Sequence, residues 1–238
     1  MKKNWSLLMV LWMTALTITA DSCIAHIHGN GKVVKEERTV TGFEEVSVST
    51  GIELILNQDS FEKVVVETDE NIQKILKTEV TGNKLKVYLS EGVNHAKELK
   101  VYVTVKQLKA VSASAGSEVK TEGKINADNL KITSSSGSEV KMEVSCTSLL
   151  VDSSSGSELT VSGNAVEIKA ESSSGSDLNA VKLVAEKGEA SASSGSDLDI
   201  HVTKEIKARS SSGSNITVWG NPANRDTNSS SGGDVDFE

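Results

Sequence analysis

Proline and aromatic residues are scarce in this sequence. Pro222 is the single proline among 238 residues, and aromatic residues make up 3% of the chain. Because proline interrupts strand ladders, a chain that nearly lacks it is compatible with continuous β-strand. The formal net charge of −8 is spread along the chain and interleaved with lysines. Without a basic cluster, the sequence excludes a nucleic-acid partner.

Long apolar runs are confined to the N-terminus. Two lysines precede an apolar stretch from Trp5 to Ile18, which is followed by the small residue Ala20. This order is the layout of an export signal. No later run is long enough to span a bilayer. We therefore predict a signal peptide over residues 1–22 and an exported mature protein.

The two cysteines occupy different parts of the chain. Cys23 stands where a bacterial lipoprotein carries its lipid-modified cysteine. We predict that Cys23 is lipidated, that residues 23–37 form a tether, and that the protein is an outer-membrane lipoprotein facing the periplasm or the cell surface. Cleavage after Ala20 is the alternative and would make the protein soluble in the periplasm or secreted. Cys146 is interpreted as a small buried hydrophobic residue rather than half of a disulfide.

One short polar phrase recurs through the second half of the chain. A clear copy is SSSGSEV at 134–140, and steps of 18 to 21 residues separate its glycines, which are Gly116, Gly137, Gly156, Gly175, Gly195, Gly213 and Gly232. Periodicity of this length indicates a solenoid in which each copy forms one coil. Serine and glycine runs are poor helix formers. We predict an all-β, single-stranded solenoid with about 19–20 residues per coil.

Alignment on the glycines shows the alternation expected of strands. Three places after each glycine the residue is apolar in every copy, and two further rows are mostly apolar. The first row is Val119, Val140, Leu159, Leu178, Leu198, Ile216 and Val235; the second, five places after glycine, is Thr121, Met142, Val161, Ala180, Ile200, Val218 and Phe237; the third, five places before it, is Val111, Ile132, Val151, Ala170, Ala190, Ala208 and Thr227. Because strand side chains alternate between faces, we predict that all three rows point inward.

The serines and the glycine mark a narrow corner between two strands. We expect a positive φ at the glycine, which other residues resist. Small serine side chains fit such a corner, and their hydroxyls can bond to neighbouring backbone or to each other along the stack. An unpaired buried hydroxyl would cost roughly 1–3 kcal/mol, so ladders of paired serines are expected.

Residues 38–110 are more apolar but follow the same pattern. In EVSVSTGIELIL, alignment of Gly51 with the later glycines places the flanking apolar residues on the inward rows. We interpret residues 38–110 as more apolar coils that precede the SSSGS coils of 111–238, in one domain over 38–238. The segment NIQKILKTEV (71–80) is compatible with a helical turn or with a strand and corner.

Three stretches together resemble a known family. They are RTVTGFEEVSVSTGIELIL, VVVETDENIQKILKTEVTGNKLKVYL and the recurring SSSGS followed by Asp or Glu. They resemble the auto-transporter adhesin head domains of the GIN type, found largely in exported proteins of Bacteroides and relatives. The resemblance covers roughly residues 38–230. It implies a right-handed parallel β-helix in the cell envelope and assigns no catalytic residues.

An acidic residue follows two places after most of the glycines. Stacked about 4.8 Å apart, these carboxylates would repel by about 1 kcal/mol per neighbouring pair in water. The row, a candidate calcium site, is Glu118, Glu139, Glu158, Asp177 and Asp197. The alternative, which we prefer, is a solvated row screened by salt and by Lys120 and Lys141. No cofactor is expected. The histidines His26 and His28 are assigned to the tether, and His95 and His201 to isolated surface positions.

The sequence shows no constellation typical of an enzyme. Catalytic sites of β-helix enzymes need convergent acids or a basic residue beside them, but the carboxylates here recur in rows. Arg38, Arg209 and Arg225 lie in different coils. Trp219 occupies an outward position and is the one candidate for stacking on a sugar, with edge packing as the alternative. We predict no catalysis.

These observations favour an exported cell-envelope β-helix that acts as an adhesion or interaction module. The expected partners are an envelope glycan or protein and, through Cys23, the membrane. One alternative is a carbohydrate-binding or carbohydrate-active β-helix protein of the envelope. Another is a scaffold that oligomerises end to end by coil stacking, because the last coil at Asp234–Glu238 looks open.

Overall fold

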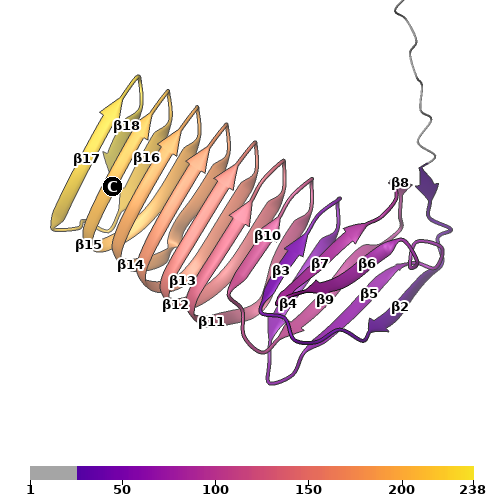
Figure 1. The fold of residues 1–238 in the computed structure, drawn as a ribbon. Helices are drawn as coiled ribbons and strands as arrows, with labels where there is room; N and C mark the ends of the chain where they lie inside the picture. Colours follow the sequence, from indigo (N-terminus) through magenta and orange to yellow (C-terminus); the bar gives the residue numbers. More distant parts are fainter. Residues whose placement is uncertain (1–25) are drawn as a thin grey trace, which may run out of the picture.

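The computed structural model describes residues 26–238, so the predicted leader and Cys23 lie outside the described residues. Within these residues every regular element is a β-strand (Figure 1). The strands are β1 (Ile27–His28), β2 (Val33–Arg38), β3 (Glu45–Val48), β4 (Glu53–Gln58), β5 (Lys63–Asp69), β6 (Leu76–Thr81), β7 (Lys84–Leu89), β8 (Val93–His95), β9 (Leu99–Val105), β10 (Ala110–Ala113), β11 (Glu118–Ser134), β12 (Glu139–Ser154), β13 (Glu158–Ser173), β14 (Asp177–Ser193), β15 (Asp197–Ser211), β16 (Asn215–Trp219), β17 (Asn224–Ser230) and β18 (Asp234–Phe237).

The C-terminal part of the molecule is a stack of parallel coils, which confirms the predicted solenoid. Each long strand from β11 to β15 runs from one serine-glycine corner to the next and bends back on itself on the way (Figure 1). Neighbouring coils pair in parallel, so that Val140 faces Leu159 and Leu159 faces Leu178. Residues at equivalent positions of successive repeats therefore lie in one row along the stack.

The apolar rows form the core of the stack. Leu159, Leu178 and Ala170 are fully buried, as are most members of the three predicted inward rows. The exceptions lie mainly in the last coil. Thr227 was expected to point inward but is exposed on β17, while Val235 is only half-buried. These positions lose their cover because no further coil packs on β17 and β18 within the described residues.

The corner between strands uses two residues with positive φ. In the corner at 134–138, Gly137 has a φ of 68° and the preceding Ser136 has a φ of 54°. The same pair recurs at each later corner of the stack. The glycine conformation confirms the sequence prediction, whereas the left-handed serine was not anticipated. Non-glycine residues seldom occupy this region, so the stack holds the serine there.

Buried serine hydroxyls tie five corners, at Ser117, Ser138, Ser157, Ser176 and Ser196, to the coil before them. The Ser176 hydroxyl accepts a hydrogen bond from the Ser173 N–H (3.1 Å). It lies 2.8 Å from the carbonyl oxygens of Ser173 and of Ser153, which belongs to the preceding coil. Within the coil its oxygen is 3.0 Å from Ser172 Oγ. The serines therefore pair within a coil and bond to backbone between coils, instead of forming a hydroxyl ladder along the stack.

The N-terminal part departs from the predicted run of coils. One coil, formed by β3, the corner at Gly51 and β4, stacks on β10 and β11, as the alignment predicted. Strands β7 and β9 add a further parallel layer on β3 and β4, whereas β5 lies antiparallel between β2 and β9 and β6 pairs antiparallel with β7. The interpretation of 38–110 as successive coils is therefore corrected in part: β3, β4, β7 and β9 stack in parallel, but β5 and β6, together with β2, pair antiparallel and cap the solenoid.

The expected tether also contains ordered structure. Strand β1 pairs with β8, and β2 pairs antiparallel with β5, so the folded domain begins well before residue 38. Asp69 fixes this segment: its carboxylate accepts hydrogen bonds from the N–H groups of Gly31 and Lys97. Burial would raise the pKa of Asp69, but these backbone donors together lower it. Residues 70–75 form a turn that leads into β6, so segment 71–80 combines a turn and a strand.

The serine network predicts a contrast between two buried hydroxyls four residues apart. Replacing Ser176 with alanine leaves the Ser173 N–H without its partner, so the free energy of unfolding should fall by about 1–3 kcal/mol. Replacing Ser172 with alanine should cost less, because Ala192 already occupies the equivalent position one coil later. Chemical denaturation of both variants measures the difference. Equal losses would show that the Ser176 contacts do not hold the corner.

Candidate functional site

The predicted acidic residues do form a spatial row. In-register pairing places Glu118, Glu139, Glu158, Asp177 and Asp197 side by side along the stack. The first two have lysine partners: Lys120 Nζ lies 2.5 Å from Glu118 Oε1, and Lys141 Nζ contacts Glu139 Oε1. In residues 26–238 no three His, Cys, Asp or Glu side chains are grouped so as to hold a metal ion.

The later members of the row lack such partners. Glu158, Asp177 and Asp197 form no ion pair in the described part of the chain. The Asn215 side-chain amide donates a hydrogen bond to Asp197 Oδ1 (2.9 Å). Although Asp177 is exposed, partial desolvation raises its pKa, and the carboxylates of Glu158 and Asp197 raise it further. This part of the face is an exposed surface of uncompensated negative charge.

The other predicted site residues are dispersed. Trp219, on β16, is 38% exposed beside His201 of β15, and it lines none of the hollows described below. The β1–β8 pairing places His28 next to His95, two residues that the sequence treated as unrelated. The three arginines have separate partners: Gln73 for Arg38, Asp226 for Arg209, and the Phe237 ring for Arg225.

A large hollow lies where the stack of coils is interrupted. Strand β4 ends at Gln58, the chain then forms the capping sheet, and it returns to the stack through residues 106–109. Strand β11 therefore pairs with β4 as far as Thr121 and with β10 from Lys131 onward. Between these points β11 pairs with β12 alone. An open groove of ≈ 880 Å³, called the bend groove below, lies beside this unsupported bend.

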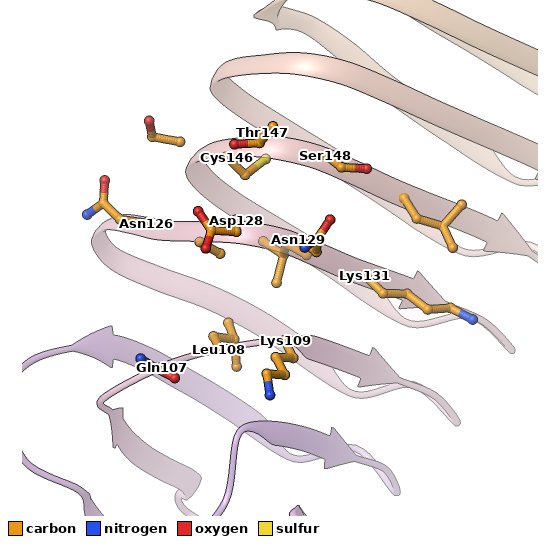
Figure 2. A pocket seen from close by; sticks show the side chains of 14 residues that line it. Gln107, Leu108, Lys109, Asn126, Asp128, Asn129, Lys131, Cys146, Thr147 and Ser148 are labelled. Atoms are coloured by element: carbon orange, nitrogen blue, oxygen red, sulfur yellow. The ribbon is translucent and has the colours of Figure 1, made fainter.

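Side chains from three segments line the bend groove (Figure 2). The polar ones carry amides, hydroxyls or a charge, and the apolar ones are buried or half-buried. The lining consists of Gln107, Leu108 and Lys109 from the connection; Asn126, Ala127, Asp128, Asn129, Leu130 and Lys131 from β11; and Ser145, Cys146, Thr147, Ser148 and Leu150 from β12. Leu108 and Leu130 are each 2% exposed, so the groove has an aliphatic floor beneath a polar rim.

Two contacts fix the ends of the bend groove. The Gln58 side chain takes the place of a missing strand: its Oε1 accepts from the Asn126 N–H (2.8 Å), and its Nε2 donates to the Asn126 carbonyl oxygen (3.0 Å). At the other end Lys109 Nζ lies 2.6 Å from Glu44 Oε2. Cys146, as predicted, is a buried free cysteine, and burial raises the pKa of its thiol to about 11.

No motif of the sequence signals this groove directly. Its polar rim stands out only as NADN at 126–129 and CTS at 146–148, which break the alternation between corners. The hollow itself depends on where the chain leaves the stack after Gln58. That departure could have been suspected from the long stretch between the corners at Gly51 and Gly116, which exceeds one repeat.

The protein is a β-solenoid of parallel coils with a continuous apolar core and a capping sheet. Its outward rows of polar residues form an extended surface. The chain belongs to the family described as putative auto-transporter adhesin, head GIN domain, whose model matches residues 42–222. This family implies a surface or exported protein. In the described residues no helix is long and apolar enough to cross a membrane.

Solved structures share the fold at low sequence identity. A putative adhesin from Bacteroides fragilis is 22% identical with a TM-score of 0.84, and the match covers 89% of this chain and 100% of that one. A putative adhesin from Parabacteroides distasonis is 20% identical with a TM-score of 0.75, covering 90% and 100%. A putative lipid binding protein from the same species is 17% identical with a TM-score of 0.74, covering 90% and 100%. No curated protein matches the chain.

The charge of the acidic row predicts opposite effects of two neutralising substitutions. Asp177→Asn should raise the melting temperature at neutral pH, because it removes a carboxylate with a raised pKa among like charges. On acidification through that pKa the wild type becomes protonated and gains the same stability, so the gap should close. Glu139→Gln, which loses its Lys141 partner, should not be stabilising.

Thermal melts of the three proteins across the acidic and neutral range measure these differences. A melting temperature for Asp177→Asn below that of the wild type at neutral pH would contradict the repulsive row. A second result would also contradict it: millimolar calcium raises the melting temperature of the wild type but not that of Asp177→Asn. The row would then bind a cation.

Proposed function

We propose that this protein is an exported cell-envelope interaction module of the adhesin type, which binds an envelope glycan or protein through its surface without catalysis. The register of the coils carries the proposal. Because neighbouring coils pair in register, each outward position recurs along the stack, and an apolar core supports this surface. The hollows on this surface are open, as expected for contact with a large partner rather than for enclosure of a substrate. Family membership supports the same role.

The N-terminus supports a membrane anchor. The leader pattern over 1–22 ends before Cys23, and strand β1 begins at Ile27, so the folded domain starts almost directly after the proposed lipid. A lipid on Cys23 would hold the capping sheet close to the outer membrane, on either face. Cleavage after Ala20 would release the same domain as a soluble protein.

The two alternatives have less support. A carbohydrate-active enzyme needs acids that converge on one bond, whereas the carboxylates of the described coils keep to their rows. An end-to-end scaffold needs an apolar coil end. Instead, the Arg225 guanidinium lies 4.1 Å from the centroid of the Phe237 ring in the last coil, and places a charge on that end. A carbohydrate-binding role is compatible with the adhesin proposal and is developed below.

Binding and fractionation of the protein test the proposal together. The mature domain should bind at least one component of an array of glycans and extracellular matrix proteins. In cells expressing the full chain, the protein should fractionate with the envelope, and Cys23→Ala should move it to the soluble exported fraction. Heat-denatured domain provides the control for non-specific adsorption.

Two results would count against the proposal. Binding no stronger than that of the denatured control would remove the interaction role. Release of new reducing ends from a polysaccharide by the purified domain would favour the carbohydrate-active alternative. Unchanged envelope retention of Cys23→Ala would remove the lipid anchor and leave the binding role in place.

A further inference from the structure

We infer that the bend groove is a binding site for a short neutral oligosaccharide, which would be the ligand by which the module recognises its partner. This inference rests on the proposed function and assigns it a place and a ligand chemistry. Four properties of the groove support it: its origin, its lining, its charge and the state of its backbone edge.

The groove originates from the topology and is not a gap between loosely packed side chains. Between Thr121 and Lys131 the bend of β11 has a neighbouring strand on one side only. In the later coils the bend is followed on both sides by another coil, as β13 lies between β12 and β14. The stack therefore has a fixed opening at this bend. Two of its three lining segments belong to strands β11 and β12, which position their side chains before a ligand arrives.

The rim carries groups that match sugar hydroxyls. Asn126, Asn129 and Gln107 offer amides, and each amide both donates and accepts. Thr147 and Ser148 offer hydroxyls with the same double capacity. A sugar hydroxyl also donates and accepts, so such a rim can satisfy it in either role. The Asp128 carboxylate adds an acceptor at the centre of the rim (Figure 2).

The floor offers an apolar surface of suitable size. The half-buried Ala127 and Leu150 supply its accessible part, above the buried Leu108 and Leu130. The C–H face of a pyranose ring can lie on such aliphatic side chains while its hydroxyls meet the rim. A volume of ≈ 880 Å³ is near the upper end of the range of about 300–1,000 Å³ found for ligand sites. The groove therefore suits a short oligosaccharide better than a single sugar.

Charge favours a neutral ligand over an acidic one. Lys109 is already paired with Glu44 (2.6 Å). The remaining charges of the lining are those of Lys131 and Asp128, which have opposite sign and no ion-pair partner in the described residues. The lining thus has little net charge to attract a sulfated or sialylated glycan. By contrast, the two smaller hollows are lined by charged rows that include Glu171, Arg209 and Lys169.

An extended peptide is a less suitable occupant. Addition of a strand would require free backbone groups along the edge of β11. The Gln58 amide already bonds both the N–H and the carbonyl oxygen of Asn126, where such pairing would begin. A saccharide uses side chains of the rim and does not need this edge. We therefore commit to a glycan, and peptide binding becomes an outcome of the test.

The test compares variants of the groove with a matched pair far from it. Asp128→Ala with Asn129→Ala removes two exposed rim groups, and Thr147→Trp fills the groove with a large ring. Asn215→Ala with Asp234→Ala makes the same type of change on β16 and β18, at the opposite end of the solenoid (Figure 1). Because all these side chains except the new tryptophan are exposed and small, the melting temperature should change little, and it is measured for each variant.

The probes are arrays of neutral hexose and N-acetylhexosamine oligomers, of sulfated and sialylated glycans, and of unstructured peptides. The wild type should bind a neutral oligomer. Loss of two hydrogen bonds should weaken that binding by about tenfold or more in the double groove variant, as measured by calorimetric titration with that oligomer. Thr147→Trp should abolish it, and the distant pair should leave it unchanged.

The outcomes separate this inference from the proposed function. Neutral-glycan binding that survives both groove variants would overturn the assigned site and leave the adhesin role standing. Binding only to acidic glycans, or only to peptides, would overturn the ligand chemistry. Absence of binding to any glycan or matrix protein would remove the proposed function itself.

Discussion

Parallel pairing of successive coils in one register is the constraint on which the rest of the structure depends. It places Val140, Leu159 and Leu178 in one row and so turns weakly apolar repeats into a continuous core. No single coil could bury its apolar edge, so stability must come from the contacts between neighbours. The same register aligns the carboxylates of the acidic row, and their repulsion adds to the partial desolvation that raises the pKa of Asp177. Core and surface thus follow from one geometric rule.

The repeat predicted the solenoid well because the rule is local in sequence. A glycine every coil and a period-two alternation sufficed to place the inward rows and the corner at Gly137. The left-handed Ser136 was missed, because serine has no intrinsic preference for that conformation; the stacked backbone selects it, since the Ser136 carbonyl accepts from the Gly116 N–H of the preceding coil and Ala115 has a similar φ. Thr227 was misplaced because an inward position is buried only where another coil covers it.

The N-terminal half and the candidate site could not be predicted in the same way. Alternating strands look alike whether they pair in parallel or antiparallel, so the sequence did not distinguish a coil from the β2–β5–β9 sheet. The bend groove exists because the chain leaves the stack after Gln58 and re-enters at Ala110, an event of topology rather than composition. Its binding groups lie where the regular repeat is interrupted, whereas the predicted candidates, the acidic row and Trp219, follow the repeat.

The most direct test of the stacking claim is disulfide cross-linking between adjacent coils. Thr160 and Asn179 are paired across β13 and β14, and paired strands lie about 4.8 Å apart, which is within reach of a disulfide. A protein with cysteine at both positions should cross-link on mild oxidation much faster than one with cysteines at Thr160 and Asp177, which are offset along the strand. Equal or faster cross-linking of the offset pair would contradict the register, and with it the arrangement of core, acidic row and groove.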